Sequence, residues 1–574
     1  MVRKGLARGS RGGRAGGLCK ASSYGFSGVM WPVSEKKEGV VQSRGAEAIA
    51  ALCLFLVTAS LIAAGWVWLG AEQPMPVSPF AQGEKAHCIS YAPFRTYETP
   101  FGEDRPVDVR AIESDLGQLS AITGCVRTYS VDHGLDRIAG IAKTRGMKVM
   151  QGLWLSGVPE RNALEVATAV RLAREYPETI AAVVVGNEVL LRREMSPSEL
   201  ARTIREVKAQ VGVPVTYADV WEFWLRYREL ASEVDFVTVH ILPYWEDLPV
   251  PARQAAQHVD AIRRQVAPFF SGKEIFIGEF GWPSAGRMRE GALPSPSNQA
   301  RAMHEVLALA NRENWRLNLI EAYDQWWKRQ LEGTVGGHWG LYDAVRRLPK
   351  FHFGGAVSDH PYWGLQAAGG IAMAALTFAA AMRRPNRELR WFWIRVSTIA
   401  LIAAGLIGWT IENAALETFT LLDALRTSTW TVIALLLPGL AVRALASGRC
   451  VPAFAQVLGP KPERLDALAW SMGVLRLGLV VIATQAAVAL AFDGRYRDFP
   501  YAPLAGAVVP LLLLAGWNRR ARPPAAELAF AITLTMCAVY IALAETFANW
   551  QACWFSAGLI LLAWTLLQAK RAPD

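Results

Sequence analysis

The sequence has few charged residues for its length. Only 19% of its 574 residues are Asp, Glu, Lys or Arg, whereas 52% are hydrophobic. The hydrophobic excess is uneven: it lies near residues 48–70 and after about residue 361, while residues 84–355 have the composition of an ordinary soluble domain. This pattern is typical of a membrane protein that carries a water-facing domain.

Metal-binding patterns are missing as well. The seven cysteines are scattered without CxxC or Cys/His spacing, which argues against a zinc site. We therefore expect no metal and no cofactor. Cys88 and Cys125 fall on adjacent predicted strands of the soluble domain, so a disulfide could join them in a periplasmic compartment. Buried free thiols are the expected state of this pair.

The net charge of +10 does not indicate nucleic-acid binding. Much of the basic excess lies in the first 46 residues and in short loops between apolar segments, where the cytoplasmic flanks of a membrane protein are expected to be basic. Residues 1–46 are rich in Gly, Arg and Ser, and we expect them to form a disordered cytoplasmic tail.

One apolar segment precedes the soluble domain. Ala48 to Leu69 is long enough to cross a membrane, so residues 47–71 are predicted to be a transmembrane anchor. A cleaved signal peptide is the alternative. The run is long and lies far from the N-terminus, which favours a retained anchor. Residues 72–83 contain several prolines and are interpreted as a linker.

Between residues 84 and 355, short apolar strands alternate with amphipathic helices. Eight such units in roughly 260 residues predict a (β/α)8 TIM barrel. A doubly wound open sheet is the alternative, but no Gly-rich phosphate-binding turn follows the first strand. The expected strands are Cys88–Phe94, Cys125–Tyr129, Lys148–Leu155, Ile180–Asn187, Val213–Tyr217, Phe236–Ile241, Glu274–Glu279 and Leu317–Tyr323.

The region 361–569 is predicted to be a multi-pass α-helical membrane domain with about seven helices. Its connections alternate between basic and acidic or neutral, and with the first anchor the positive-inside rule is met by eight crossings. Both termini then lie in the cytoplasm, and the barrel lies on the periplasmic side of the inner membrane. Asp423 and Arg426 crowd the start of the fourth crossing, which makes it the weakest, and seven or nine crossings remain alternatives.

Two of the predicted strands end in a glutamate. Glu188 follows Val-Gly-Asn187, and Glu279 lies in Ile-Gly-Glu-Phe-Gly-Trp282. A parallel barrel places chemistry at its C-terminal strand ends, and two carboxylates there can cleave a glycosidic bond. Glu188 would protonate the leaving oxygen and Glu279 would attack the anomeric carbon. The simpler alternatives are a helix cap or arginine pair for Glu188 and an ion pair with Arg127 for Glu279.

Several short motifs carry a family resemblance. Residues 84–345 resemble glycoside hydrolase family 17, the retaining β-1,3-glucanases and glucanosyltransferases. Gly-Asn-Glu188 on the fourth strand and Gly-Glu279-x-Gly-Trp-Pro on the seventh are together fairly specific. The weaker matches are Tyr91-Ala-Pro-Phe94, Arg127-Thr-Tyr129, Tyr217-Ala-Asp219, Pro243-Tyr-Trp245 and His338-Trp-Gly-Leu-Tyr342. The resemblance implies that Glu188 is the acid/base and Glu279 the nucleophile.

The remaining candidate residues would bind substrate. Aromatic rings suit the C–H faces of glucose, and Asn187 is placed to hydrogen-bond a sugar 2-OH. Gln325 stands where plant relatives usually have Glu, which leaves the substrate register open, while Lys328 is retained. His240 ends the sixth strand and is expected to support the site through a hydrogen bond. The expected substrate-binding residues are Tyr91, Arg127, Trp154, Asn187, Tyr217, Tyr244, Trp282, Glu321, Trp327 and Lys328.

The sequence therefore predicts a retaining β-1,3-glucan-active enzyme at the inner membrane. Its expected partners are a β-glucan, the membrane and, from the looser resemblance to the bacterial branch of the family, a glucan synthase. Transfer that makes or remodels β-1,3/β-1,6 glucan is favoured over simple hydrolysis. A non-catalytic glucan-binding accessory and a transporter with an appended domain are the competing hypotheses. Carboxyl groups about 5–5.5 Å apart would indicate retention, and about 6.5–9.5 Å would indicate inversion.

Overall fold

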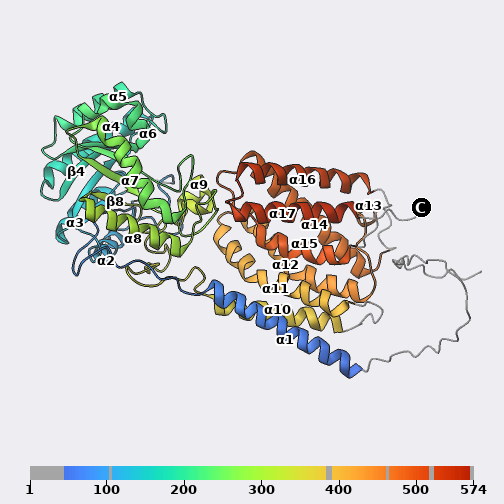
Figure 1. Cartoon of the computed structure of the whole chain (residues 1–574). Coiled ribbons are helices and arrows are strands. Elements are labelled where there is room, and N and C mark those ends of the chain that lie inside the picture. Colours follow the sequence, from blue (N-terminus) through green and yellow to red (C-terminus); the bar gives the residue numbers. More distant parts are fainter. Residues whose placement is uncertain (1–43, 103–105, 383–390, 460–464, 516–522, 569–574) are drawn as a thin grey trace, which may run out of the picture.

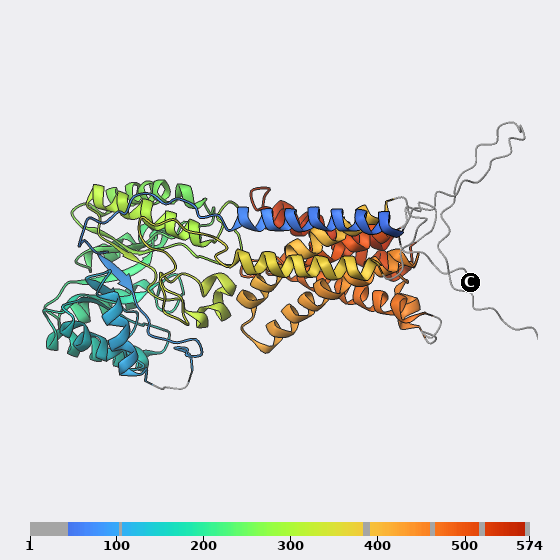
Figure 2. The ribbon, with the colours of Figure 1, turned by 90° about the horizontal axis from the view of Figure 1, so that it is seen from below.

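The structure is a computed structural model that describes residues 44–102, 106–382, 391–459, 465–515 and 523–568. It has a barrel with helices around it and, beside the barrel, a bundle of long helices (Figure 1). A view turned by 90° shows the same two parts end to end (Figure 2). Most of the predicted basic tail lies outside the described residues, as do several of the predicted basic loops, although residues 443–459 are described.

Eight parallel strands close into a barrel in chain order, which confirms the predicted TIM-barrel fold. The strands are short and almost wholly buried, because a parallel barrel is covered by side chains inside and by helices outside. They are β1 (Cys88–Ser90), β2 (Cys125–Arg127), β3 (Lys148–Leu153), β4 (Ile180–Asn187), β5 (Val215–Val220), β6 (Val237–His240), β7 (Ile275–Phe280) and β8 (Leu317–Leu319).

Some of the helices around the barrel begin at side-chain caps. In α5 the Ser196 side chain accepts from the backbone of Glu199, whose carboxylate returns to the Ser196 backbone, and Pro197 occupies the first turn. These helices are α2 (Val109–Leu119), α3 (Ile138–Thr144), α4 (Pro159–Glu175), α5 (Pro197–Lys208), α6 (Trp221–Arg226), α7 (Ala255–Val266), α8 (Pro296–Glu313) and α9 (Arg329–Gly336).

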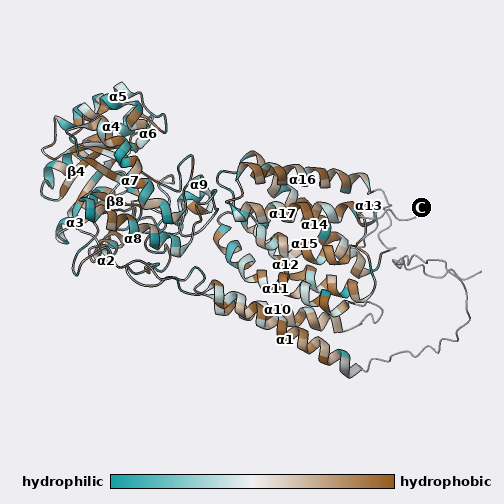
Figure 3. Ribbon diagram, in the orientation of Figure 1, coloured by the Kyte–Doolittle hydropathy of each residue, from teal (hydrophilic) through white to brown (hydrophobic). Residues whose placement is uncertain are grey.

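The second part is a bundle of apolar helices with its own hydrophobic core. Figure 3 shows that these helices are far more hydrophobic than the helices around the barrel. They are α1 (Arg44–Leu69), α10 (Trp363–Met382), α11 (Phe392–Glu417), α12 (Leu421–Ala446), α13 (Phe454–Leu458), α14 (Ala467–Phe492), α15 (Tyr501–Leu514), α16 (Ala525–Ala544) and α17 (Trp550–Leu567).

Seven of these helices are long and apolar enough to cross a membrane. The predicted fourth crossing is among them, because α12 runs for 26 residues despite Asp423 and Arg426 in its first turns. The short member is instead α15, with 14 residues, which corresponds to the predicted sixth crossing. Almost all of α15 is buried inside the bundle, so its surroundings are other helices.

Helix α1 packs into the bundle although the barrel separates it from the other apolar helices in the sequence. Trp66 is 2% exposed and its indole N–H donates to the carbonyl of Gly405 at 3.2 Å. Thr58 and Ser397 share a hydrogen bond of 2.8 Å between their hydroxyls. These contacts favour a retained anchor over a cleaved signal peptide.

The expectation of free thiols at Cys88 and Cys125 was wrong. The two residues form a disulfide. They lie on β1 and β2, which are neighbours in the sheet, and their Cα atoms are 4.4 Å apart. Parallel pairing therefore brings the two side chains within bonding reach.

The C-terminal face of the barrel is turned toward the helical bundle. In the loop after β7, the Met288 N–H donates to the Gln551 side chain at 2.9 Å, and Asn549 donates to the Met288 carbonyl at 2.8 Å. In α9, Gly333 has φ +70°, and a Cβ atom at this position would lie 1.9 Å from the carbonyl oxygen of Tyr496. Only glycine permits this approach, so α9 is fitted closely against the loop between α14 and α15.

Candidate active site

The end of β4 turns sharply at its polar residues. Gly186 has φ +89° and Glu188 has φ +51°, and a Cβ atom on Gly186 would lie 2.6 Å from the Val189 side chain. The Glu188 N–H donates to the Ala218 carbonyl of β5 at 2.8 Å, which holds the turn against the barrel. A glycine followed by a strained non-glycine residue is typical of a functional strand end.

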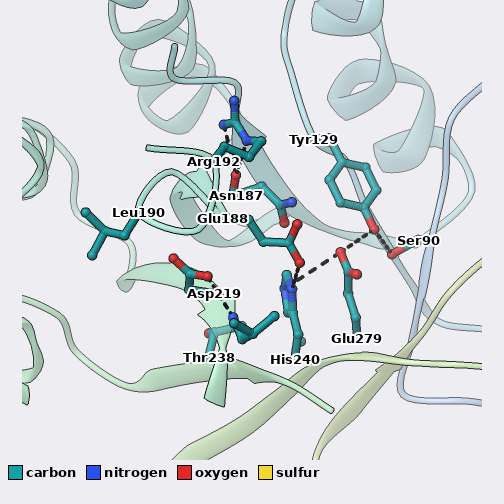
Figure 4. A network of polar contacts seen from close by, with 12 residues as sticks. Ser90, Tyr129, Asn187, Glu188, Leu190, Arg192, Asp219, Thr238, His240 and Glu279 are labelled. Carbon is teal, nitrogen blue, oxygen red and sulfur yellow. Dashed lines mark hydrogen bonds and ion pairs between the residues drawn. The ribbon is translucent and has the colours of Figure 1, made fainter. Parts of the chain in front are cut away.

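Glu188 and Glu279 meet on opposite sides of one imidazole (Figure 4). Nδ1 of His240 lies 2.9 Å from Oε1 of Glu188, and Nε2 lies 3.7 Å from Oε1 of Glu279. One oxygen of each carboxylate and the ring nitrogen all lie within 4.8 Å of one another. His240 therefore contacts both glutamates, in keeping with its expected supporting role. The two glutamates face one another at the barrel mouth.

The two carboxylates differ in their surroundings. The Glu188 side chain is 22% exposed, whereas that of Glu279 is 6% exposed. Arg127 donates to Oε1 of Glu279 at 3.0 Å and Tyr129 donates to the same oxygen at 2.8 Å. Burial alone would raise the pKa of Glu279, but His240, Arg127 and the Tyr129 hydroxyl outweigh burial and hold this pKa below its usual value. Glu279 is thus kept ionised.

Arg127 also fixes the orientation of Asn187. Its Nη2 donates to Oδ1 of Asn187 at 2.6 Å, while Nη1 donates to the Gly278 carbonyl at 2.7 Å. With its oxygen occupied, Asn187 has its amide NH2 group left to donate. The ion pair between Glu279 and Arg127, which was the simpler alternative for Glu279, is present. It is part of the candidate site and does not exclude a catalytic role for Glu279.

Glu188, His240 and Glu279 also have the residue types and spacing to hold a metal ion. Arg127 already lies 3.0 Å from Glu279 and 3.5 Å from His240. A guanidinium so close opposes a second cation, which makes the site better suited to two carboxylates acting on a neutral sugar.

Four of the predicted substrate-binding rings are fully buried. The hydroxyl of Tyr91 donates to Asp115 at 3.0 Å, that of Tyr217 donates to Asp219, and that of Tyr244 donates to the Arg287 carbonyl at 2.7 Å. Trp282 donates to the Leu293 carbonyl at 3.1 Å. None of these rings is more than 1% exposed, so they pack behind the cleft and offer no open face to a sugar. Arg127 is likewise fully buried.

Two predicted tryptophans are only half-buried. The guanidinium of Arg192 lies over the Trp154 ring at 4.2 Å, after the end of β3. Trp327 donates to Oε1 of Gln325 at 2.9 Å and packs at 5.4 Å against the edge of Phe101. Their rings lie near the rim of the barrel mouth, where a sugar ring can stack.

Lys328 and Glu321 form an ion pair at 2.8 Å. Burial raises the pKa of Glu321 to about 7 even though Lys328 opposes this shift. Gln325, the departure from plant relatives, donates to the Ala92 carbonyl at 3.0 Å and accepts from Trp327. Gln325 therefore braces the loop after β8, and the carboxylate partner of Lys328 comes from Glu321.

Two further residues lie at the site although the sequence did not indicate a role for either of them. Tyr129 hydrogen-bonds the Glu279 carboxylate, and its place two residues after Arg127 on the same strand end was the available signal. Glu332 of α9 is close enough to Lys328, Glu188 and Glu279 that their charges affect its pKa, which burial raises. Nothing in the sequence around Glu332 marks this proximity, because it depends on how α9 folds back over the cleft.

Comparisons with known proteins agree with this architecture. Residues 88–340 match the family model of the BtgE/BtgC glycoside hydrolase domain. A glucan 1,3-beta-glucosidase of Candida albicans is 25% identical over 263 residues, which cover 42% of this chain and 85% of that protein. A glucan 1,3-beta-glucosidase of Arthroderma benhamiae is 29% identical over 298 residues, which cover 48% of this chain and 92% of that protein.

Among solved structures, a family 17 beta-1,3-glucanosyltransferase from Rhizomucor miehei is 26% identical. It covers 46% of this chain and 95% of its own, with a TM-score of 0.41. The family-model match, residues 88–340, lies within the barrel domain. Residues 88–340 therefore match a BtgE/BtgC glycoside hydrolase domain, and this match and the curated relatives fit glycoside hydrolase family 17.

Proposed function

We propose that the barrel cleaves β-1,3-glucan with retention of configuration and transfers the cleaved chain to a sugar acceptor. The observation that carries this proposal is the approach of the Glu188 and Glu279 carboxylates, with one oxygen of each within 4.8 Å of the other. An oxygen–oxygen approach within 4.8 Å supports the short carboxyl spacing of retaining enzymes, about 5–5.5 Å, over the about 6.5–9.5 Å of inverting enzymes. The names of the curated relatives support the choice of β-1,3-glucan.

The reaction has two displacements. A Glu279 oxygen attacks the anomeric carbon and forms a glycosyl ester, while Glu188 gives its proton to the departing glycosidic oxygen. Glu188, now ionised, then takes a proton from water or from a sugar hydroxyl, whose oxygen attacks the same carbon and releases Glu279. His240 holds the Glu188 carboxylate through its 2.9 Å contact during both proton transfers.

Neighbouring residues prepare the nucleophile and the substrate. Arg127 and Tyr129 stabilise ionised Glu279, which keeps it ready to attack. Asn187 directs its amide NH2 toward the 2-OH of the sugar at the point of cleavage. Trp154 and Trp327 stack glucose rings on either side, and the Lys328–Glu321 pair hydrogen-bonds their hydroxyls. Tyr91, Tyr217, Tyr244 and Trp282 support these residues from the core.

The helical bundle anchors this enzyme in a membrane. We propose that α1, α10 to α12 and α14 to α17 cross the inner membrane, and that the barrel lies on the periplasmic side. Several helices are long and apolar enough to cross, and the Cys88–Cys125 disulfide suits an oxidising compartment. We assign residues 47–71 to the anchor, 72–83 to the linker, 84–355 to the catalytic domain and 361–569 to the membrane domain.

Transfer rather than hydrolysis suits an enzyme tethered where a glucan synthase delivers new chains. The expected products are β-1,3 or β-1,6 linked glucans. The test is to incubate the purified full chain with a β-1,3-linked glucose oligosaccharide of one length and to analyse product lengths, linkages and the first-formed anomer. Longer products with retained configuration, absent with Glu279→Gln, are expected. If all products are shorter than the substrate, the enzyme is a simple hydrolase. If the first-formed product has the inverted configuration, the proposed mechanism is wrong.

A further inference from the structure

A cavity of about 300 Å³ lies at the junction of the barrel and the helical bundle. On the barrel side it is lined by the loops after β6 and β7, which supply Arg287 and Arg289. On the bundle side it is lined by the last residues of α14 and α16 and by Arg495 of the loop between α14 and α15. Its size falls at the lower end of cavities that hold small ligands.

Arg287, Arg289 and Arg495 line this cavity together with Glu290 and Glu545, so its charged side chains carry an excess of one positive charge. Arg287 is tied to the Glu545 carboxylate and to the Gly494 carbonyl, yet its buried Nε has no hydrogen-bond partner in the described part of the chain. Arg289 donates to the Tyr244 carbonyl at 2.6 Å, and Arg495 is exposed. Across the described ranges neither of these two arginines forms an ion pair.

The like charges are also close enough to oppose one another. Burial is the main reason that the pKa of Arg287 is lowered to about 10, and the charge of Arg289 adds to this effect. The pKa of Arg289 is lowered by burial as well and, in part, by the charge of Arg495, whereas Tyr244 and Glu290 oppose this shift. A bound anion would relieve this repulsion. Glu545 already forms an ion pair with Arg287 and so does not neutralise the other two arginines.

The other wall of the cavity is apolar and continues onto the surface of the bundle. Leu490, Ala491 and Phe492 end α14, and Tyr540 and Ala544 lie in the last turns of α16. Phe492 is 87% exposed and Tyr540 is 55% exposed. Both helices have the length and composition to cross a membrane, and these are their barrel-facing ends (Figure 1).

We propose that this cavity binds the phosphate headgroup of a membrane phospholipid, with Arg289 and Arg495 as the phosphate ligands. A guanidinium presents paired N–H donors that match phosphate oxygens, and a hydrocarbon chain can follow the exposed apolar side chains of α14 and α16. The ends of membrane-crossing helices lie at the level of the lipid headgroups, and basic pockets between such helices can bind anionic headgroups. The proposal rests on the membrane placement proposed above and is independent of the sugar chemistry.

A bound lipid would also reach the substrate side of the barrel. The Arg289 guanidinium lies over the ring of Trp245 at 5.4 Å, and Trp245 stacks on Trp339 with ring centroids 6.3 Å apart. Tyr496 packs edge-on against Trp245 at 5.7 Å. The lipid headgroup would therefore fix the barrel mouth at one height and tilt above the membrane surface.

The test uses the detergent-purified full chain and measures its melting temperature as phosphatidylglycerol is added. Diacylglycerol with the same chains is the matched probe without phosphate, and glycerol 3-phosphate is the headgroup without chains. We expect a saturable rise of several degrees with phosphatidylglycerol only. The rise should be reduced in Arg495→Gln, whose exposed side chain is not needed for folding, and lost in the Arg289→Gln/Arg495→Gln double variant.

Arg497→Gln is the control, because Arg497 is an exposed arginine of the same loop that pairs with Asp493 at 3.0 Å and does not line the cavity. It should keep the full rise. An equal rise with diacylglycerol, or an unchanged rise in the double variant, would overturn the proposal. An equal rise with glycerol 3-phosphate would show an anion site without a lipid. Glucan cleavage, assayed separately on laminari-oligosaccharides, distinguishes failure of this proposal from failure of the proposed function.

Discussion

Arg127 and Glu279 form a buried ion pair across 3.0 Å at the centre of the barrel. Arg127 comes from β2 and Glu279 from β7, so the pair joins two strands that β1 and β8 separate in the closed sheet. The same guanidinium reaches Asn187 on β4. One residue thereby orients the proposed nucleophile and the proposed ligand of the sugar 2-OH.

Replacing Arg127 should damage both stability and activity. Arg127→Met leaves the Glu279 carboxylate buried without its guanidinium, and breaking one partner of a buried pair costs about 3–5 kcal/mol. We expect a lower melting temperature and loss of glucan cleavage. Arg127→Lys, which keeps the charge but cannot reach both Glu279 and Asn187 with a planar fork, should recover stability better than activity. Arg202→Met on α5 serves as an unrelated arginine control, and equal melting temperatures for Arg127→Met and this control would contradict the pairing.

Tyr129→Phe should move the acid side of the pH–activity profile. The Tyr129 hydroxyl donates to Glu279 and favours its ionised form, so removing the hydroxyl must raise the pKa of Glu279. A hydrogen bond to a charged group contributes about 1.5–3 kcal/mol, which corresponds to a rise of about 1–2 pH units. Profiles of kcat/KM against pH would measure it. Tyr97→Phe, an exposed tyrosine, should leave the profile in place, and an unshifted acid limb in Tyr129→Phe would refute a role in ionising Glu279.

Glu188→Gln should separate proton donation from substrate binding. General acid catalysis contributes about 10²–10⁴-fold, so cleavage of a β-1,3-oligosaccharide should fall by that factor. A laminari-oligosaccharide with a dinitrophenolate leaving group needs no proton, and the first step on this substrate should be nearly unchanged. Burst kinetics would measure that step. An equally large loss on both substrates would mean that Glu188 acts by holding the site together rather than by giving a proton.

The two catalytic candidates could be located from the sequence because each ends a strongly apolar strand. The period and composition of Ile180–Asn187 and of the run around Glu279 predict buried parallel strands, and closure of the barrel brings their ends together. His240 was foreseen on the same reasoning. The sequence did not predict that β1 and β8 end early. The residues that follow these two strands continue the apolar pattern although they lie in loops.

Contacts that depend on side-chain burial could not be foreseen in the same way. Tyr244 and Trp282 follow strand ends, as substrate-binding aromatics do, yet their polar atoms bond to loop carbonyls and their rings pack inward. Similarly, nothing local indicates that Glu332 approaches the cleft. These positions are decided by long loops and by the helical bundle against which α9 lies.

Gly333→Ala tests whether the barrel mouth and the bundle are fitted to one another. A Cβ atom at this position would lie 1.9 Å from the Tyr496 carbonyl, and φ is +70°. With ψ at −168°, Gly333 lies in a backbone region that essentially only glycine adopts, so a side chain there costs about 1–3 kcal/mol, and the backbone contact adds to this cost. Gly272→Ala is the control: Gly272 also has positive φ, +82°, but no atom lies within 4 Å of its added Cβ, so the variant has a positive-φ side chain without the clash. Gly333→Ala should therefore lower the melting temperature more than Gly272→Ala and should weaken glucan cleavage, since α9 carries Glu332 beside the catalytic pair. Equal melting temperatures and equal activities for the two variants would show that the barrel tolerates displacement from the bundle.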